Sequence, residues 1–263
     1  MADIRDNSIT WGGKNSALYG IIVRKNPPLT RATRKYTKVN VAGRNGDLYI
    51  FQNAWDNYTQ TYELRVGDGS ENSTPLAMAQ VAQWLAMDEL HTPTYTDYLN
   101  LEVNGYHQLV DTYEPDVIRL ATLTEGYSTD NLRGFYGNVD VTFNFRPERF
   151  TKDAFTEIVI TGASETIVNP ASMPAKPNIL VAPYAEDGII VNDYEISFTY
   201  TDATRRIVID TELQDCYFDD DLSNANSYVI MPDGFPILST GSNTISLGTY
   251  ITEVTIIPRW WNL

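Results

Sequence analysis

The chain ends in GSNTISLGTYITEVTIIPRWWNL (residues 241–263), an alternating apolar stretch that closes with two tryptophans. Val254, Ile256 and Pro258 fall on one face of an extended strand, and the alternation continues to Trp260. Trp260 is therefore predicted to close a hydrophobic core, because removing an indole ring from water is strongly favourable. The alternative interpretation is an exposed platform on which a saccharide ring stacks.

The opposite face of this strand is predicted to carry Arg259 and Trp261. We expect Trp261 to pack against the N-terminal domain or against a neighbouring subunit. Short apolar segments precede the strand at intervals of roughly 10 to 18 residues, a spacing typical of a β-sandwich. These segments are EISFTY, RRIVID, SYVIM and NTISL.

Three prolines within NPASMPAKP (residues 169–177) mark the boundary before this sandwich, since a proline cannot donate a ladder hydrogen bond in a central strand. We therefore expect a C-terminal β-sandwich over residues 178–263. Residues 147–177 are expected to hold a linker and a first strand, and residues 1–146 a separate N-terminal domain.

The N-terminal domain is predicted to be β-structure with a single helix. FYGNVDVTFNF (residues 135–145) places Val139, Val141, Phe143 and Phe145 on one face of a strand. The Asn-Gly pair within RNGDLYIF is typical of a hairpin turn. The apolar run ALYGIIVRK, which starts at Ala17 and ends at Lys25, is expected to form a further strand.

The single helix is predicted from STPLAMAQVAQWLAMDEL (residues 73–90). Pro75 fits the first helical position, where its missing N–H costs nothing. An apolar stripe at i, i+3, i+4 and i+7 indicates that this helix packs on a sheet. The stripe consists of Met78, Val81, Ala82 and Leu85. Trp84 is a further candidate for a core or interface position.

The 263 residues carry a formal net charge of −15, which is unevenly distributed. Residues 1–150 hold 14 Lys and Arg against 18 Asp and Glu, whereas residues 151–263 hold 5 against 16. Because an acidic surface repels a phosphate backbone, sequence-specific nucleic-acid binding is not expected, although DNA could pass through a channel with such a wall. Neither a secretory signal nor an apolar run of about 18 residues is found, so we expect folding in a cytoplasm and no membrane partner.

No motif for covalent or metal chemistry stands out: the nucleophile pattern G-x-S-x-G is missing, and the lone Cys216 excludes an intrachain disulfide. His91 and His107 lack a zinc-binding spacing and are expected to be ordinary loop or surface residues. The acidic stretches GDGSEN (residues 67–72) and FDDDLSNAN (residues 218–226) do not match a calcium loop. We predict no enzyme, no cofactor and no metal, while a carboxylate pair for glycoside hydrolysis stays an open alternative because such a pair forms in space.

A basic stretch runs through residues 24–44. Its cations include Arg31, Arg34, Lys35, Lys38 and Arg44. The simplest interpretation is a solvated hairpin and loop, since isolated surface charges contribute little. The functional interpretation is an electrostatic dock for an acidic surface, such as the acidic C-terminal domain of a neighbouring copy.

From residue 169 onward the chain resembles the distal tail protein (Dit) family of siphophages, bacteriophages with long non-contractile tails. The segments that carry the resemblance are NPASMPAKPNILV, RRIVID, GFPILSTGSNTISLG and EVTIIPRWWNL. In the first half, GRNGDLYI, the single helix and VDVTFNFRPERF agree with the family in order and spacing. The resemblance therefore extends over nearly the whole chain.

This resemblance implies a mainly β protein, with an N-terminal belt domain (a β-sandwich with one α-helix) that forms a homohexameric ring and a C-terminal galectin-like β-sandwich outside it. Family members join the tail tube protein to the baseplate or tail tip and act as a hub for the tail-associated lysin or fibre protein and for receptor-binding proteins. The implied role is a non-enzymatic virion component of the phage tail tip, assembled in the host cytoplasm. The alternative function is a saccharide-binding adhesion module of the tail, although the short sandwich leaves no room for the long insertions that bind saccharides in some members.

Overall fold

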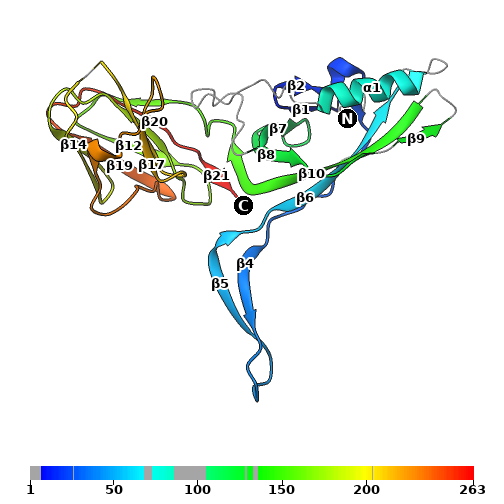
Figure 1. The fold of residues 1–263 in the computed structure, drawn as a ribbon, viewed down its shortest axis with the longest axis horizontal. Helices are drawn as coiled ribbons and strands as arrows, with labels where there is room; N and C mark the ends of the chain where they lie inside the picture. Colours follow the sequence, from blue (N-terminus) through cyan, green and yellow to red (C-terminus); the bar gives the residue numbers. More distant parts are fainter. Residues whose placement is uncertain are drawn as a thin grey trace. The chain divides into compact units, whose positions relative to one another are not determined.

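The computed structural model describes residues 7–25, 27–67, 73–85, 105–127, 129–132, 136–202 and 204–263. The chain divides into two compact units: the described residues up to Arg149, together with Leu263, belong to the first, and Phe150–Asn262 belong to the second. Strands dominate both units, and the described residues hold one α-helix, α1 (Ser73–Leu85), in the first (Figure 1).

An antiparallel sheet forms the centre of the first unit, with the strand order β2-β1-β7-β8-β10-β6-β3 and with β9 also paired to β10. The bounds of these strands are β1 Ile9–Trp11, β2 Lys14–Asn15, β3 Ile22–Val23, β6 Tyr58–Val66, β7 His107–Asp111, β8 Val117–Leu123, β9 Thr129–Leu132 and β10 Tyr136–Thr151. Because β10 is the longest of them, it carries most of the pairing in the unit.

The ladder between β6 and β10 builds the core of the first unit. Its register places Tyr62 opposite Val141 and Leu64 opposite Val139, so one face of the pair is apolar over its whole length. Val139, Val141, Phe143 and Phe145 are fully buried, as the alternation of the sequence predicts. Trp11 packs edge-on against Phe143, with the ring centroids 5.1 Å apart.

Helix α1 covers this core with a stripe that differs from the predicted one. Ala77, Val81, Trp84 and Leu85 are the buried positions, whereas Ala82 is exposed, so the predicted stripe is wrong at Ala82. The buried face includes Trp84, which is fully buried and whose Nε1 donates to the carbonyl oxygen of Lys14 at 2.9 Å.

None of the helices in the described ranges has the length and apolarity that crossing a membrane requires.

The apolar run at residues 17–25 forms less strand than predicted. Residues Ser16–Tyr19 form a 3-10 helix, η2, which begins where the Asn15 side chain accepts from the Ala17 N–H at 2.9 Å. Gly20 ends η2 with a left-handed φ of 68°, a conformation that favours glycine. Only Ile22–Val23 remain extended, as β3, because this local capping competes with strand pairing.

A long hairpin extends away from the sheet of the first unit (Figure 1). It consists of β4 (Arg34–Val39), β5 (Leu48–Trp55) and their connecting loop, and residues 34–55 are called the arm below. At the base of the arm, the N–H of Asp56 donates to the carbonyl oxygen of Thr33 at 2.8 Å. The arm is a separate two-stranded sheet, paired only within itself among the described strands.

The second unit is a β-sandwich of two five-stranded sheets, ordered β11-β20-β13-β16-β17 and β12-β19-β14-β15-β18. The bounds are β11 Ile158–Ile160, β12 Ser164–Asn169, β13 Asn178–Val181, β14 Asp187–Val191, β15 Tyr194–Phe198, β16 Ile207–Asp210, β17 Asp215–Phe218, β18 Val229–Ile230, β19 Gly241–Leu247 and β20 Val254–Ile257, followed by β21 Trp261–Asn262. The stretch expected to hold a linker and a first strand thus contains β11 and β12.

The two sheets of the sandwich differ in how deeply they are buried. Every residue of β13, β16 and β20 is buried, so the first sheet is covered on both faces. In the second sheet, β12, β14, β15 and β19 alternate between buried and exposed residues, which leaves one face open to solvent.

Candidate functional site

The register of the arm sorts its side chains onto two chemically different faces. Residues directly opposite each other in an antiparallel pair point to the same side, and the pairs alternate along the arm. One face, the aromatic–cationic face, carries Arg34, Tyr36, Lys38, Tyr49 and Phe51. The other, the aliphatic face, carries Thr37, Val39, Leu48 and Ile50.

The rings of the aromatic–cationic face contact one another. Tyr36 packs edge-on against Tyr49 at 5.1 Å and against Phe51 at 6.0 Å between ring centroids. The guanidinium of Arg34 lies over the Phe51 ring at 5.4 Å from its centroid. These contacts orient the cations and rings into one continuous strip along the arm.

Both faces of the arm are exposed to solvent. All of β4 is exposed, and in β5 the exposed fractions of Ile50 and Phe51 are 51% and 57%. A lone two-stranded hairpin is marginally stable in water, and large exposed apolar patches mark interaction sites. Because one contact covers only one face, the arm offers two separate surfaces for binding, one aromatic and cationic and one aliphatic.

The predicted basic residues lie on or beside this arm and are all exposed. Lys38 forms an ion pair with Asp47 at 2.8 Å, and Arg34 donates to the carbonyl oxygen of Gln52 at 3.2 Å. Arg31 donates to the carbonyl oxygen of its neighbour Thr30 at 3.2 Å. The remaining two, Lys35 and Arg44, form no ion pair with any described residue. The structure therefore brings Arg34 and Lys38 together on one face.

From the sequence, only the cations of the arm were predicted to form a binding surface; its aromatic and aliphatic residues were not. A signal was present: Leu48–Phe51 is an unbroken apolar run inside a hairpin. In a half-exposed strand the apolar residues alternate with polar ones, whereas an unbroken run indicates that both faces are to be covered. Among the described strands no second layer covers the arm, so we expect a binding partner to cover it.

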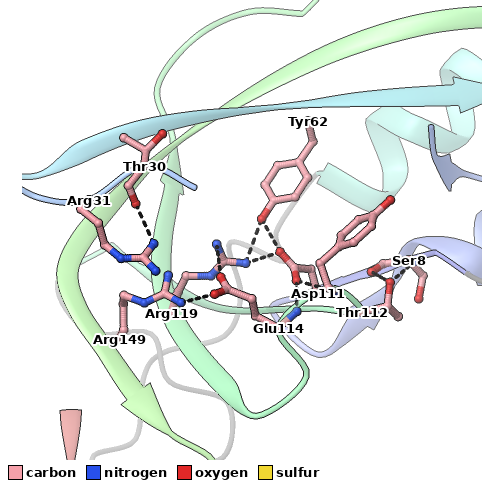
Figure 2. Close-up of polar contacts among 10 residues, drawn as sticks. Ser8, Thr30, Arg31, Tyr62, Asp111, Thr112, Glu114, Arg119 and Arg149 are labelled. Carbon is pink, nitrogen blue, oxygen red and sulfur yellow. Dashed lines mark hydrogen bonds and ion pairs between the residues drawn. The ribbon is translucent and has the colours of Figure 1, made fainter. Parts of the chain in front are cut away.

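A buried charged network lies within the sheet of the first unit (Figure 2). Arg119 and Asp111 form an ion pair in which each side chain is 1% exposed. The Tyr62 hydroxyl donates to Asp111 Oδ2 at 2.7 Å and accepts from Arg119 Nη2 at 2.9 Å. Arg149 pairs with Glu114, whose Oε2 lies 3.9 Å from Arg119 Nη1. The network thus ties β6, β7, β8 and β10 together.

Burial and charge set the protonation of this network. Burial, reinforced by the neighbouring Asp111 carboxylate, raises the pKa of Tyr62 well above its ordinary value, although Arg119 acts in the opposite direction. Burial by itself lowers the pKa of Arg119, but Tyr62 and Asp111 outweigh it, so the net direction is upward. Tyr62 therefore stays neutral and Arg119 stays charged at neutral pH, which suits a network that holds strands in place.

The four residues singled out as core or interface candidates take different positions. Trp84 is fully buried in the first unit and Trp260 is 4% exposed in the second. Trp261 is half-buried and its Nε1 donates to the carbonyl oxygen of Pro174 at 2.8 Å. Arg259 pairs with both carboxylate oxygens of Asp210, at 2.9 and 3.0 Å.

The predicted alternation of the C-terminal strand is wrong beyond Ile257. Strand β20 ends there, and Arg259 has a left-handed φ of 57°, which reverses the direction of the following side chains. The pairing of Arg259 with the buried Asp210 holds this unusual backbone conformation. Within β20, Thr255 and Ile257 are buried as well, because this sheet is covered on both faces, and Ile257 packs with Leu180 and Val208.

The acidic stretch at residues 218–226 is engaged by arginines. Arg205 pairs with Asp220 and Asp221, and Arg206 pairs with Asp219. The described residues hold no group of three or more His, Cys, Asp or Glu that could bind a metal ion. The other acidic stretch lies outside the described residues except for its first glycine.

The remaining candidates for chemistry are a cysteine and two histidines. Burial, with smaller contributions from Asp215 and Asp210, raises the pKa of the Cys216 thiol to about 12, so this thiol is poorly reactive. His107 lies in β7, half-buried, with its ring edge-on to Trp11 at 5.6 Å. His91 lies outside the described residues.

Comparison with solved structures identifies the fold. The chain is similar to the crystal structure of the Dit (gp 19.1) protein of SPP1, described as a paradigm of the hub adsorption apparatus in Gram-positive infecting phages. The TM-score is 0.69 at 12% identity, and the match covers 95% of this chain and 97% of that chain. No protein-family model matches the sequence, and no curated protein matches it significantly. The mainly β, Dit-like fold predicted from the sequence is thereby confirmed.

Proposed function

We propose that this chain, which has the fold of SPP1 Dit, is a self-assembling structural hub of a bacteriophage tail tip. Its copies join head to tail into a homohexameric ring, and the ring connects the tail tube protein to the proteins of the tip, such as a tail-associated lysin, a fibre protein or a receptor-binding protein. The protein acts as a virion component and has no catalytic role. Two lines of support are the similarity in fold and the chemistry of the arm.

The observation that carries the proposal is the arm with its exposed aromatic–cationic face and its exposed aliphatic face. Fully burying one large apolar side chain contributes about 1.5 to 3 kcal/mol, so covering several of them supplies the free energy that association requires. The surface that receives an arm differs from the arm itself. Contacts of this heterologous kind close into rings when the rotation between copies is right.

The test is the mass of the particle in solution, measured by light scattering after size exclusion. One chain has a mass of 29.7 kDa, so six copies give about 178 kDa, and negative-stain images of that peak are expected to show rings. The variant Ile50→Asp with Phe51→Asp places a charge on each face of the arm and is expected to yield monomers.

The matched control is Leu18→Asp, because Leu18 is an apolar residue of the same unit that is 83% exposed and lies outside the arm. This variant is expected to assemble like the unaltered chain. A chain that stays monomeric at every concentration, or an arm variant that assembles normally, contradicts the proposal.

A further inference from the structure

A groove of about 480 Å³ lies on the open face of the second sheet of the sandwich, over β14, β15 and β19. Its lining includes Glu186, Gly188, Ile190, Glu195, Ser197 and Ser246. Beside the groove, Ile230 of β18 pairs with Ser197 and is 54% exposed. This face of the sheet is therefore partly apolar and open to a partner.

The charge of the groove is negative and uncompensated. The five strands of this sheet contain no Lys or Arg. Glu186 and Glu195 are exposed and form no ion pair with any described residue. Four of the five cations of this unit pair with acids elsewhere: Lys176 with Glu212, Arg205 with Asp220 and Asp221, Arg206 with Asp219, and Arg259 with Asp210. The fifth, Lys152, is exposed and lies outside this sheet. A ligand of this groove is therefore expected to carry positive charge.

The two glutamates are separated by a hollow. Glu195 is paired with Ile190, and Glu186 precedes Ile190 by four residues, which corresponds to about 13 Å along the strand. Midway between them, Gly188 pairs with Ser197. A side chain cannot be added at Gly188 without strain, since its Cβ would lie 2.6 Å from the carbonyl oxygen of Ile196. The groove thus presents an acid, a hollow and an acid in sequence.

The aromatic–cationic face of the arm has the complementary order. Arg34, Tyr36 and Lys38 follow one another at every second residue of β4, so the Cα atoms of the two cationic residues are also about 13 Å apart, with an aromatic residue between them. The Arg34 guanidinium itself lies over the ring of Phe51, the partner of Tyr36. The ion pair between Lys38 and Asp47 is solvent-exposed, and exchanging such a pair for another costs little.

We propose that the aromatic–cationic face of one copy's arm docks in this groove of a second copy. The two cations face Glu186 and Glu195, the Tyr36 ring occupies the hollow over Gly188, and the remaining rings cover Ile190 and Ile230. This inference rests on the proposed function and names the surface that receives the arm. A neutral saccharide in the same groove would leave both glutamates uncompensated, which favours the arm as the occupant.

Charge reversal on each side of the contact tests the pairing. The groove variant combines Glu186→Lys with Glu195→Lys, and the arm variant combines Arg34→Glu with Lys38→Glu. Each variant is expected to raise the concentration at which the assembly dissociates by roughly a hundredfold, because like charges then meet. An equimolar mixture of the two variants is expected to recover assembly, since each arm then finds a groove of opposite charge on the other chain. If the arm instead contacted the groove of its own chain, mixing the two variants would not recover assembly.

The matched control is Asp233→Lys with Glu253→Lys, which changes the net charge equally at exposed positions outside the groove. It is expected to assemble like the unaltered chain. Thermal denaturation of all variants monitors folding, and the exposed positions predict unchanged midpoints.

Each of three outcomes would overturn the inference. In the first, the groove variant assembles normally while the Ile50→Asp, Phe51→Asp variant does not; the arm then acts elsewhere and the proposed function stands. In the second, the mixture of the groove and arm variants fails to recover assembly. In the third, the groove variant keeps its oligomeric state but loses binding of a neutral cell-wall saccharide, which would assign the groove to a saccharide. A monomeric unaltered chain, by contrast, contradicts the proposed function itself.

Discussion

The substitution Asp111→Asn tests whether the buried charged network holds the first unit together. It keeps the shape of the side chain but removes the charge that faces Arg119, and both side chains are 1% exposed. Glu114, at 3.9 Å from Arg119, is the acid that remains nearby. Removing one partner of a buried ion pair costs about 3 to 5 kcal/mol, so the free energy of unfolding of the first unit is expected to fall by that amount.

Hydrogen exchange of peptides from β6 and β10 measures this loss in the first unit alone. The loss corresponds to a reduction in protection of roughly a hundredfold to several thousandfold. The double variant Asp111→Asn with Arg119→Met is expected to recover part of the stability, because no unpaired charge of this pair then stays buried, while the amide oxygen still accepts from the N–H groups of Tyr113 and Glu114. Glu63→Gln is the control, because Glu63 pairs with Lys25 at the surface. The free energy of unfolding is expected to fall by less than about 1 kcal/mol in this variant. A loss below about 1 kcal/mol for Asp111→Asn would refute this reasoning.

Two further predictions concern the second unit. Trp260→Ala is expected to lower its free energy of unfolding by about 3 to 5 kcal/mol and to yield largely insoluble protein, since the ring is 4% exposed; a soluble variant with an unchanged melting temperature contradicts this. Cys216 in the folded chain is expected to react with a maleimide at pH 8 about a thousandfold more slowly than in urea, because its pKa is about 12. Since the unfolded thiol ionises first, near its ordinary pKa of 9.0, the unfolding free energy is expected to fall as the pH rises from about 9 towards 12.

The parts of the fold that depend on local patterns could be predicted from the sequence. The alternation from Val139 to Phe145 defines one face of β10, and the Asn45–Gly46 pair lies in the loop of the arm. The short apolar segments after residue 178 become strands of the sandwich. In each case the side-chain period of two residues is enough to determine the element.

The parts that depend on distant pairings could not be predicted. Arg259 breaks the alternation of the last strand because it pairs with Asp210, 49 residues earlier in the chain. The network around Arg119 draws on four strands, and no spacing in the sequence indicates it. The two faces of the arm follow from the register of β4 with β5, which the sequence restricts but does not fix.

The closure of the arm at its base has a consequence for the changes that the first unit tolerates. One backbone hydrogen bond joins Thr33 to Asp56, and everything between them lies outside the sheet of the first unit. Substitutions and changes of length within residues 34–54 are therefore expected to leave the core ladder of β6 and β10 intact. Trp55 is restricted, because its ring packs against that core.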